Sequence, residues 1–186
     1  RMTRPMRELT FLYIVLTLMA TIIYLIAGDA IFPAIILALF TISSGAGPMM
    51  DELPMIPQLM FGSGFVALLS ALPLLTLWQT LRRRNETQLT EHMELRAFFI
   101  LFLFTGTLLA IPSILSGTLP FLEALGQGYF YAISFLSTNG LMLESDMVFH
   151  PSSYLLLILL AVVGGCMGAA AGGFRLSRVL ILVSLS

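Results

Sequence analysis

Two short segments of this chain combine hydroxyl side chains with glycine, and each follows an apolar stretch directly. The first reads Ile42-Ser43-Ser44-Gly45 and the second reads Ser137-Thr138-Asn139-Gly140. Carbonyl and hydroxyl oxygens of such loops can replace the hydration shell of a monovalent cation. Glycine permits the backbone angles that turn several carbonyls in one direction. The residue types therefore predict two filter loops that line a path for a cation.

A carboxylate follows each loop at the same distance. Asp51 lies six residues after Gly45 and Asp146 lies six residues after Gly140, so a single offset of 95 relates the two pairs. The shared spacing predicts an internal repeat. Carboxylates at the mouth of a pore raise the local concentration of cations. We expect Asp51 and Asp146 to form an outer vestibule, with solvated loop charges as the alternative.

A third segment is rich in glycine and ends in a basic residue. It contains Gly164, Gly165, Gly168, Gly172 and Gly173, and Arg175 follows. Small residues let transmembrane helices approach closely, so this segment is either a helix-packing surface or a flexible gate. The arginine is either part of the ion path or an anchor whose charged end reaches the membrane surface.

The composition indicates an integral membrane protein. Hydrophobic residues make up 58% of the chain and charged residues 10%, against roughly 45–50% and about 25% in soluble domains. Lipid must solvate part of so much apolar surface. The single cysteine, Cys166, excludes a disulfide within the chain.

The charges alternate along the sequence. The nine basic residues are all arginines and fall into three clusters, namely Arg1, Arg4 and Arg7, then Arg82, Arg83, Arg84 and Arg96, then Arg175 and Arg178. Six of the ten carboxylates lie between those clusters, namely Asp29, Asp51, Glu52, Glu123, Glu144 and Asp146. Arginine in short loops marks the cytoplasmic side of a membrane protein. We therefore expect the clusters on one side and these carboxylates on the other.

Six charge-free stretches are each long enough to cross a bilayer as a helix of ~20 residues. They are residues 9–28, 30–50, 53–81, 97–122, 124–143 and 147–174. Six full crossings would place the densest arginine cluster outside, against the positive-inside tendency. If residues 30–50 and 124–143 instead enter the membrane and return on the same side, all nine arginines are cytoplasmic. We favour this second topology.

The sequence of the two returning stretches fits half-helices. Pro33 suits the first turn of a helix, and about ten residues from there to Ile42 cover ~15 Å, half of the hydrocarbon thickness. The second half-helix is expected from Tyr129 to Leu136, after Gly126 and Gly128. Each then points the partial negative charge of its C-terminus at the centre of the bilayer.

These observations predict an all-α integral membrane fold built from two units of helix, re-entrant pore loop and helix. The first unit covers residues 1–81 and the second covers residues 97–186, with the second helix of the second unit interrupted by the glycine-rich loop 164–173. Residues 82–96 form a charged cytoplasmic linker. The chain begins with Arg1 and stops within an apolar run, so we expect it to be an internal piece of a longer polypeptide.

At these residues the chain resembles the pore subunit of the Trk/Ktr/HKT superfamily of potassium transporters. The filter of that family reads roughly Ser-Thr-Thr-Gly-Phe, which the segment from Ser137 to Leu141 matches well and the segment from Ile42 to Ala46 matches loosely. The most specific match is the segment from Gly164 to Arg175, which resembles the interrupted helix of the third of four units. The resemblance places this chain at units two and three.

The resemblance implies potassium uptake through the filter loops, with residues 164–175 as a gate. It also implies a multi-pass protein of the cell (inner) membrane that contacts lipid, the remaining pore units of the same polypeptide, a second copy in a homodimer and a cytoplasmic nucleotide-binding regulatory subunit. Neither a cofactor beyond the transported K⁺ nor a nucleic acid is expected. The filter glycines favour potassium over sodium. Gly47, Met142, Ala169 and Ala170 stand where the family commonly has hydroxyl residues, which puts selectivity and gating strength in doubt.

Two other functions fit the sequence less well. One is a secondary transporter whose broken helices bind a small solute near the middle of the membrane. The other is a non-conducting paralogue with degenerate filters. An enzyme is not expected, because the charge-free stretches contain neither a carboxylate pair nor a histidine cluster.

Overall fold

The computed structural model describes residues 3–45, 57–73, 89–117, 119–143, 151–166 and 169–185. All elements in these ranges are α-helices, which confirms the predicted all-α class for the described part of the chain. They are α1 (Thr3–Ile26), α2 (Ile31–Ser43), α3 (Pro57–Ala71), α5 (Leu89–Leu115), α6 (Phe121–Leu136), α7 (Pro151–Val163) and α8 (Leu176–Leu185).

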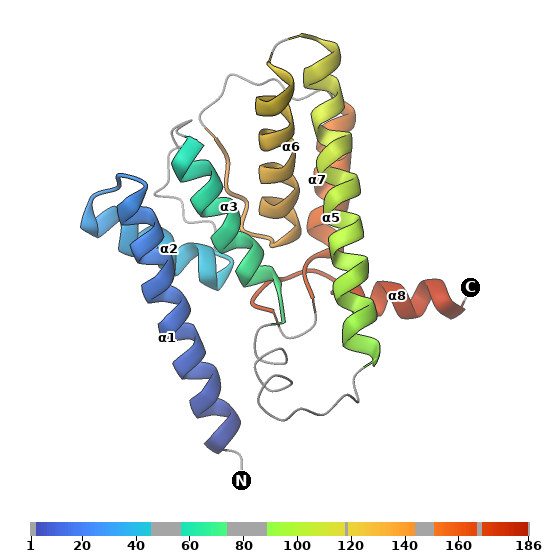
Figure 1. Cartoon of the computed structure of the whole chain (residues 1–186). Helices are drawn as coiled ribbons and strands as arrows, with labels where there is room; N and C mark the ends of the chain where they lie inside the picture. The colour runs from blue at the N-terminus through green and yellow to red at the C-terminus, as the bar shows by residue number, and fades with distance from the viewer. Residues whose placement is uncertain are drawn as a thin grey trace.

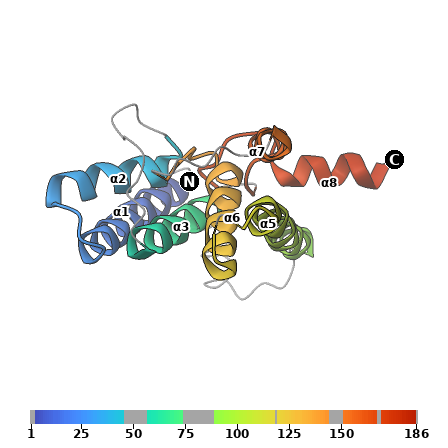
Figure 2. The same ribbon diagram turned by 90° about the horizontal axis from the view of Figure 1, so that it is seen from above.

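The helices form two similar groups of three. In the first group α2 packs against both α1 and α3, and in the second group α6 packs against both α5 and α7. Contacts between α3 and α6 join the groups. In both views the C-terminal ends of α2 and α6 point towards the middle of the molecule, whereas α8 extends away from the other helices (Figures 1 and 2). The order of long helix, short helix and further helix therefore occurs twice.

The two ends of the helical assembly differ in charge. The start of α1, the end of α3 and the start of α5 lie at the lower end in Figure 1, where α1 carries Arg7 and α5 carries Arg96. The turn between α1 and α2 and the start of α6 lie at the upper end, and these segments carry Asp29 and Glu123. Glu8 and Glu94 lie on the same helices as Arg7 and Arg96, and the sidedness of the charges in a membrane stays a prediction.

Only two described helices are long and apolar enough to cross a membrane, Met6–Ile26 of α1 and Met93–Leu115 of α5. Of the four stretches that the favoured topology expects to cross, residues 9–28 and 97–122 contain most of these two helices, and the other two contain shorter described helices. At 1.5 Å per residue, the 13 residues of α2 cover about 20 Å and the 16 residues of α6 about 24 Å. Both are shorter than the ~30 Å hydrocarbon core. Helices α3 and α7 are also short, with 15 and 13 residues.

Large apolar side chains cover the outside of the long helices. Phe11, Leu18 and Ile22 on α1 are more than half exposed, as are Ile100 and Phe104 on α5. Water would be a poor solvent for such a surface, because each exposed aliphatic or aromatic side chain forgoes about 1.5–3 kcal/mol of burial. The surface is that of a protein whose outer helices contact lipid.

The second short helix begins earlier than the sequence analysis expects. Pro120 is its N-cap and α6 starts at Phe121, so Gly126 and Gly128 lie inside the helix and do not precede it. The glycines are needed for packing and do not break the helix. A Cβ atom on Gly128 would lie 2.5 Å from the carbonyl oxygen of Gly106 on α5. The absence of a side chain at Gly106 and at Gly128 lets α5 and α6 approach closely.

The predicted linker 82–96 ends inside a helix. Helix α5 begins at Leu89, so positions 89–96 belong to it, and residues 74–88 lie outside the described ranges. The charges of this stretch do not end a helix, and neither glycine nor proline occurs between residues 85 and 111 except Gly106. Within these first turns of α5 Arg96 is exposed, whereas Glu94 is buried.

Candidate functional site

The first candidate filter loop begins where α2 ends. Ser44 follows the helix in the left-handed conformation, with φ 54° and ψ 35°. The N–H of Gly45 donates to the carbonyl oxygen of Phe40 at 3.0 Å, and the hydroxyl of Ser43 donates to the carbonyl oxygen of Leu39 at 2.7 Å. The predicted break thus occurs after Ser43, and these bonds tie the loop to the last turn of its own helix.

The second candidate filter loop turns sharply after Leu136. The N–H groups of Asn139 and Gly140 both donate to the carbonyl oxygen of Ser134, at 2.9 and 3.3 Å. Thr138 has φ 57° and Gly140 has φ 64°. A positive φ is rare for a β-branched residue such as threonine. The surrounding structure therefore holds Thr138 in a strained conformation, as is common at functional sites.

The burial of the side chains alternates along this loop. Ser137, Asn139 and Leu141 are buried, whereas Thr138 and Gly140 are only partly buried. The next alternate residue, Met142, is exposed. The hydroxyl of Ser134 donates to the carbonyl oxygen of Leu141 at 2.8 Å and fixes the loop against α6. One face of the loop is thus held by the core, and Thr138 and Gly140 lie on the open face.

The two loops match in order but not in backbone detail. Under the offset of 95, the last residue of α2, Ser43, corresponds to Thr138, whereas α6 already ends at Leu136. The left-handed residue Ser44 corresponds to Asn139, whereas the second loop has positive φ at Thr138 and Gly140. The repeat therefore places two similar turns at the ends of two short helices, without making them identical.

The glycine-rich segment interrupts a helix where the sequence predicts. Helix α7 ends at Val163 and α8 begins at Leu176. Between them the chain folds back along α7, because the N–H of Phe174 donates to the carbonyl oxygen of Val162 at 2.8 Å. The N–H of Leu176 then donates to the carbonyl oxygen of Gly165 at 3.2 Å.

Several glycines of this segment leave no space for a side chain. Gly164 has φ 71°, and a Cβ atom there would collide with the carbonyl oxygen of Gly172. A Cβ atom on Gly173, with φ 88°, would lie 2.9 Å from the Cα atom of Gly164. On Gly165 it would lie 2.7 Å from the Cβ atom of Ala171. These glycines therefore allow the two arms of the loop to pack directly against each other. Their role is close packing and not only backbone flexibility.

The glycine-rich segment contacts both helical groups. Its Cys166 and Ala170 N–H groups donate to the carbonyl oxygens of Ala71 and Ser70 at the end of α3, both at 3.2 Å. On the other side, the N–H of Gly172 donates to the hydroxyl oxygen of Thr138 at 2.8 Å. The structure thus brings the predicted gate segment into direct contact with the second predicted filter loop.

The remaining predicted site residues fall in different places. Arg175 is exposed and has φ 68°. Asp51, Asp146 and Gly168 lie outside the described residues, so the vestibule stays a prediction. Burial raises the pKa of the Asp29 carboxyl in the turn before α2.

Sequence reasoning missed two contributors to this site. Ser134 anchors the second loop from within α6, and the end of α3 at Ser70 and Ala71 anchors the glycine-rich segment. The signal for Ser134 is its place in the last turn of a half-helix, where a hydroxyl can reach the following loop. No pattern in the sequence indicates the end of α3, because the contacts use its backbone carbonyls.

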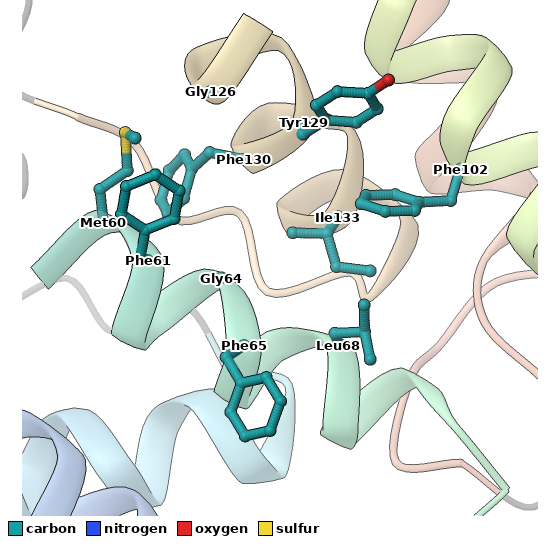
Figure 3. A pocket seen from close by; sticks show the side chains of 10 residues that line it. All are labelled: Met60, Phe61, Gly64, Phe65, Leu68, Phe102, Gly126, Tyr129, Phe130 and Ile133. Atoms are coloured by element: carbon teal, nitrogen blue, oxygen red, sulfur yellow. The ribbon is translucent and has the colours of Figure 1, made fainter. Parts of the chain in front are cut away.

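An apolar cavity of about 220 Å³ lies away from these loops, between α3, α5 and α6. Aromatic side chains form much of its wall, including Phe61, Phe65, Phe102, Tyr129 and Phe130 (Figure 3). Such a lining does not coordinate a cation through oxygen. The loops described above are therefore the better candidate site.

The comparisons with known proteins agree on one kind of relative. No family model matches the chain. The chain is 25% identical over 175 residues to the Trk system potassium uptake protein TrkI of Halomonas elongata, a match that covers 90% of this chain and 34% of the relative. It is 28% identical over 192 residues to the Trk system potassium uptake protein TrkG of Escherichia coli, covering 100% of this chain and 39% of the relative.

A solved structure has the same fold. The potassium transporter TrkH from Vibrio parahaemolyticus matches with a TM-score of 0.82 and 22% sequence identity, over 95% of this chain and 39% of that one. The chain thus spans little more than a third of the length of each protein that it matches.

Proposed function

We propose that this chain, a relative of the Trk system potassium uptake proteins, forms part of the pore of a potassium uptake transporter. The observation that carries the proposal is the second loop, in which α6 ends in a turn with positive φ at Thr138 and Gly140, and Thr138 contacts the glycine-rich helix interruption. The relatives are named for potassium uptake and not for an enzymatic activity, and the sequence predicts no catalytic group.

In the proposed mechanism, α2 and α6 enter the membrane from the outside and stop near its middle. Both helices are shorter than the hydrocarbon core, and the C-terminal partial negative charge of each faces the dehydrated ion. Carbonyl oxygens of Ser43 to Gly45 and of Ser137 to Gly140 replace water ligands of K⁺. The positive-inside tendency favours an orientation with Arg7 and Arg96 in the cytoplasm and Asp29 and Glu123 outside.

The glycine-rich segment acts as the gate in this mechanism. It folds back on itself, and it contacts the end of α3 and the second loop by hydrogen bonds. Displacement of this segment opens the path between the filter and the cytoplasm. Its glycines permit a compact closed form that larger residues would not allow.

Two loops do not surround an ion, so further units complete the filter. We propose that the chain supplies units two and three of four, with the others in the same polypeptide. Lipid, a second copy in a homodimer and a cytoplasmic nucleotide-binding regulatory subunit are the proposed partners. The cell (inner) membrane is the proposed location.

Transport by the full-length polypeptide tests this function. The protein is reconstituted into liposomes that are loaded with potassium, and uptake of a radioactive potassium analogue is followed with and without an ionophore that sets the membrane potential. We expect uptake that follows the potential and is at least tenfold slower for sodium. Saturable binding of an organic solute without a current would support a secondary transporter, and a folded protein without any flux would support a non-conducting paralogue.

A further inference from the structure

We infer that the side chain of Thr138 is a positioning residue that holds the glycine-rich segment against the second filter loop. The hydroxyl oxygen of Thr138 accepts a hydrogen bond from the backbone N–H of Gly172, with 2.8 Å between the two atoms. The two residues are 34 positions apart, so the bond joins two separate parts of the chain. The inference rests on the proposed function, because it assigns a gating role to this contact.

The position of Thr138 explains why its side chain reaches the glycine-rich segment. Its neighbours Ser137 and Asn139 are fully buried against the core, whereas Thr138 is only partly buried and lies on the open face of the loop. The left-handed conformation of Thr138, with φ 57°, sets the direction of its side chain. The N–H of Thr138 meanwhile donates to the carbonyl oxygen of Phe135 at 3.0 Å, which keeps the residue attached to α6.

The partner residue is equally well placed. Gly172 is exposed, and its Cβ position would lie 3.5 Å from the hydroxyl oxygen of Thr138. The arm that carries it lies against Gly164 in the other arm of the loop. A glycine at this point brings the backbone N–H itself to the filter. The contact is therefore made by the main chain of one loop and the side chain of the other.

This hydrogen bond links the position of the glycine-rich segment to the second filter loop. The segment is held at α3 through Ala71 and Ser70, and at the filter through Thr138. The hydrogen bonds to α3 are formed between backbone N–H and carbonyl groups, so a side-chain substitution does not remove the bonding atoms. The Thr138 contact is the one that a single substitution can remove. Loss of the hydroxyl therefore favours displacement of the segment from the filter, and the conducting state gains population.

Single-channel recording of the full-length protein in planar bilayers tests the inference. The isosteric change Thr138→Val removes the hydroxyl and keeps the branched shape, and Thr138→Ser restores the hydroxyl. A net hydrogen bond of ordinary strength predicts closed times about two- to tenfold shorter in the valine variant. The serine variant is expected to return towards the wild-type closed times. A purely structural role for Thr138 changes the current through the open pore and leaves the closed times as they are.

A cysteine pair gives an independent readout. A Cβ atom at Gly172 would lie 3.5 Å from Oγ1 and 4.0 Å from Cγ2 of Thr138, so a cysteine sulfur in place of either branch at position 138 would come within reach of a cysteine at position 172. Thr138→Cys and Gly172→Cys are combined in a Cys166→Ala background, and disulfide formation is followed by the mass of the linked peptides. We expect oxidation to link the pair and stop the current, and a reductant to restore it.

The outcomes separate the inference from the proposed function. Absence of potassium current in the wild-type protein contradicts the proposed function. Wild-type current, with valine closed times equal to those of wild type, overturns the inference alone. If the valine variant carries no current, the cysteine pair decides, because formation of the disulfide supports the contact and failure to form it overturns the inference.

Discussion

Serine in place of Gly140 is expected to reduce the preference for potassium over sodium at least tenfold. Gly140 has φ 64°, a conformation that costs an L-residue roughly 1–2 kcal/mol. A serine escapes this cost by rotating its backbone, and the carbonyl oxygens on either side then leave their positions. Each tenfold loss of discrimination corresponds to about 1.4 kcal/mol, so the strain is large enough to produce it. Bi-ionic reversal potentials of the full-length protein measure the effect.

Gly117 provides a matched control for this substitution. It lies in the turn after α5 with φ 65°, almost the same angle as Gly140, and no atom lies within 4 Å of its Cβ position. Gly117→Ser therefore introduces the same backbone strain at a distance from the filter. We expect unchanged selectivity in this control. If both variants have the same selectivity as the wild type, Gly140 is not part of the filter.

Alanine in place of Gly164 is expected to destabilise the glycine-rich segment strongly. The added Cβ atom would collide with the backbone carbonyl oxygen of Gly172, and the positive φ of 71° adds strain. Together the two effects amount to about 2–5 kcal/mol. The folded-back arm must move, and the contact between Gly172 and Thr138 is lost with it. Thermal unfolding in detergent and the rate of potassium leak through the closed protein measure the two consequences.

The comparison variant for stability is Gly172→Ala in the same segment. A Cβ atom at Gly172 meets only the side chain of Thr138, at 3.5 and 4.0 Å, which is ordinary contact. We expect its unfolding midpoint to lie close to that of the wild type. A midpoint for Gly164→Ala that equals the Gly172→Ala value would show that the two arms of the loop do not lie against each other.

The breaks between helices were predictable from local residue types. Serine and glycine mark the end of α2, and the glycine run marks the gap between α7 and α8. These signals are local, because hydroxyl side chains bond to nearby backbone and glycine accepts positive φ. The relation to Trk potassium transporters followed from the same segments and is confirmed by the two relatives.

Long-range features were not predictable from one sequence. Gly126 and Gly128 were interpreted as a boundary, because a glycine that breaks a helix and a glycine that lets another helix approach, as Gly128 does for α5, have the same local pattern. Helix α5 begins at Leu89, within the segment interpreted as a linker, because charged residues do not by themselves end a helix. The contact between Thr138 and Gly172 depends on how two distant loops fold, and no spacing in the sequence indicates it.

The proposed pore requires that residues 30–50, which include α2, enter the membrane and leave it on the same side. Single cysteines at positions 29, 51 and 85 of the full-length protein, in a Cys166→Ala background, are labelled in intact cells with a membrane-impermeant thiol reagent. With the proposed topology, we expect positions 29 and 51 to react from outside and position 85 to react only after the membrane is permeabilised. Reaction of positions 29 and 51 from opposite sides would make residues 30–50 a full crossing and would contradict the proposed filter.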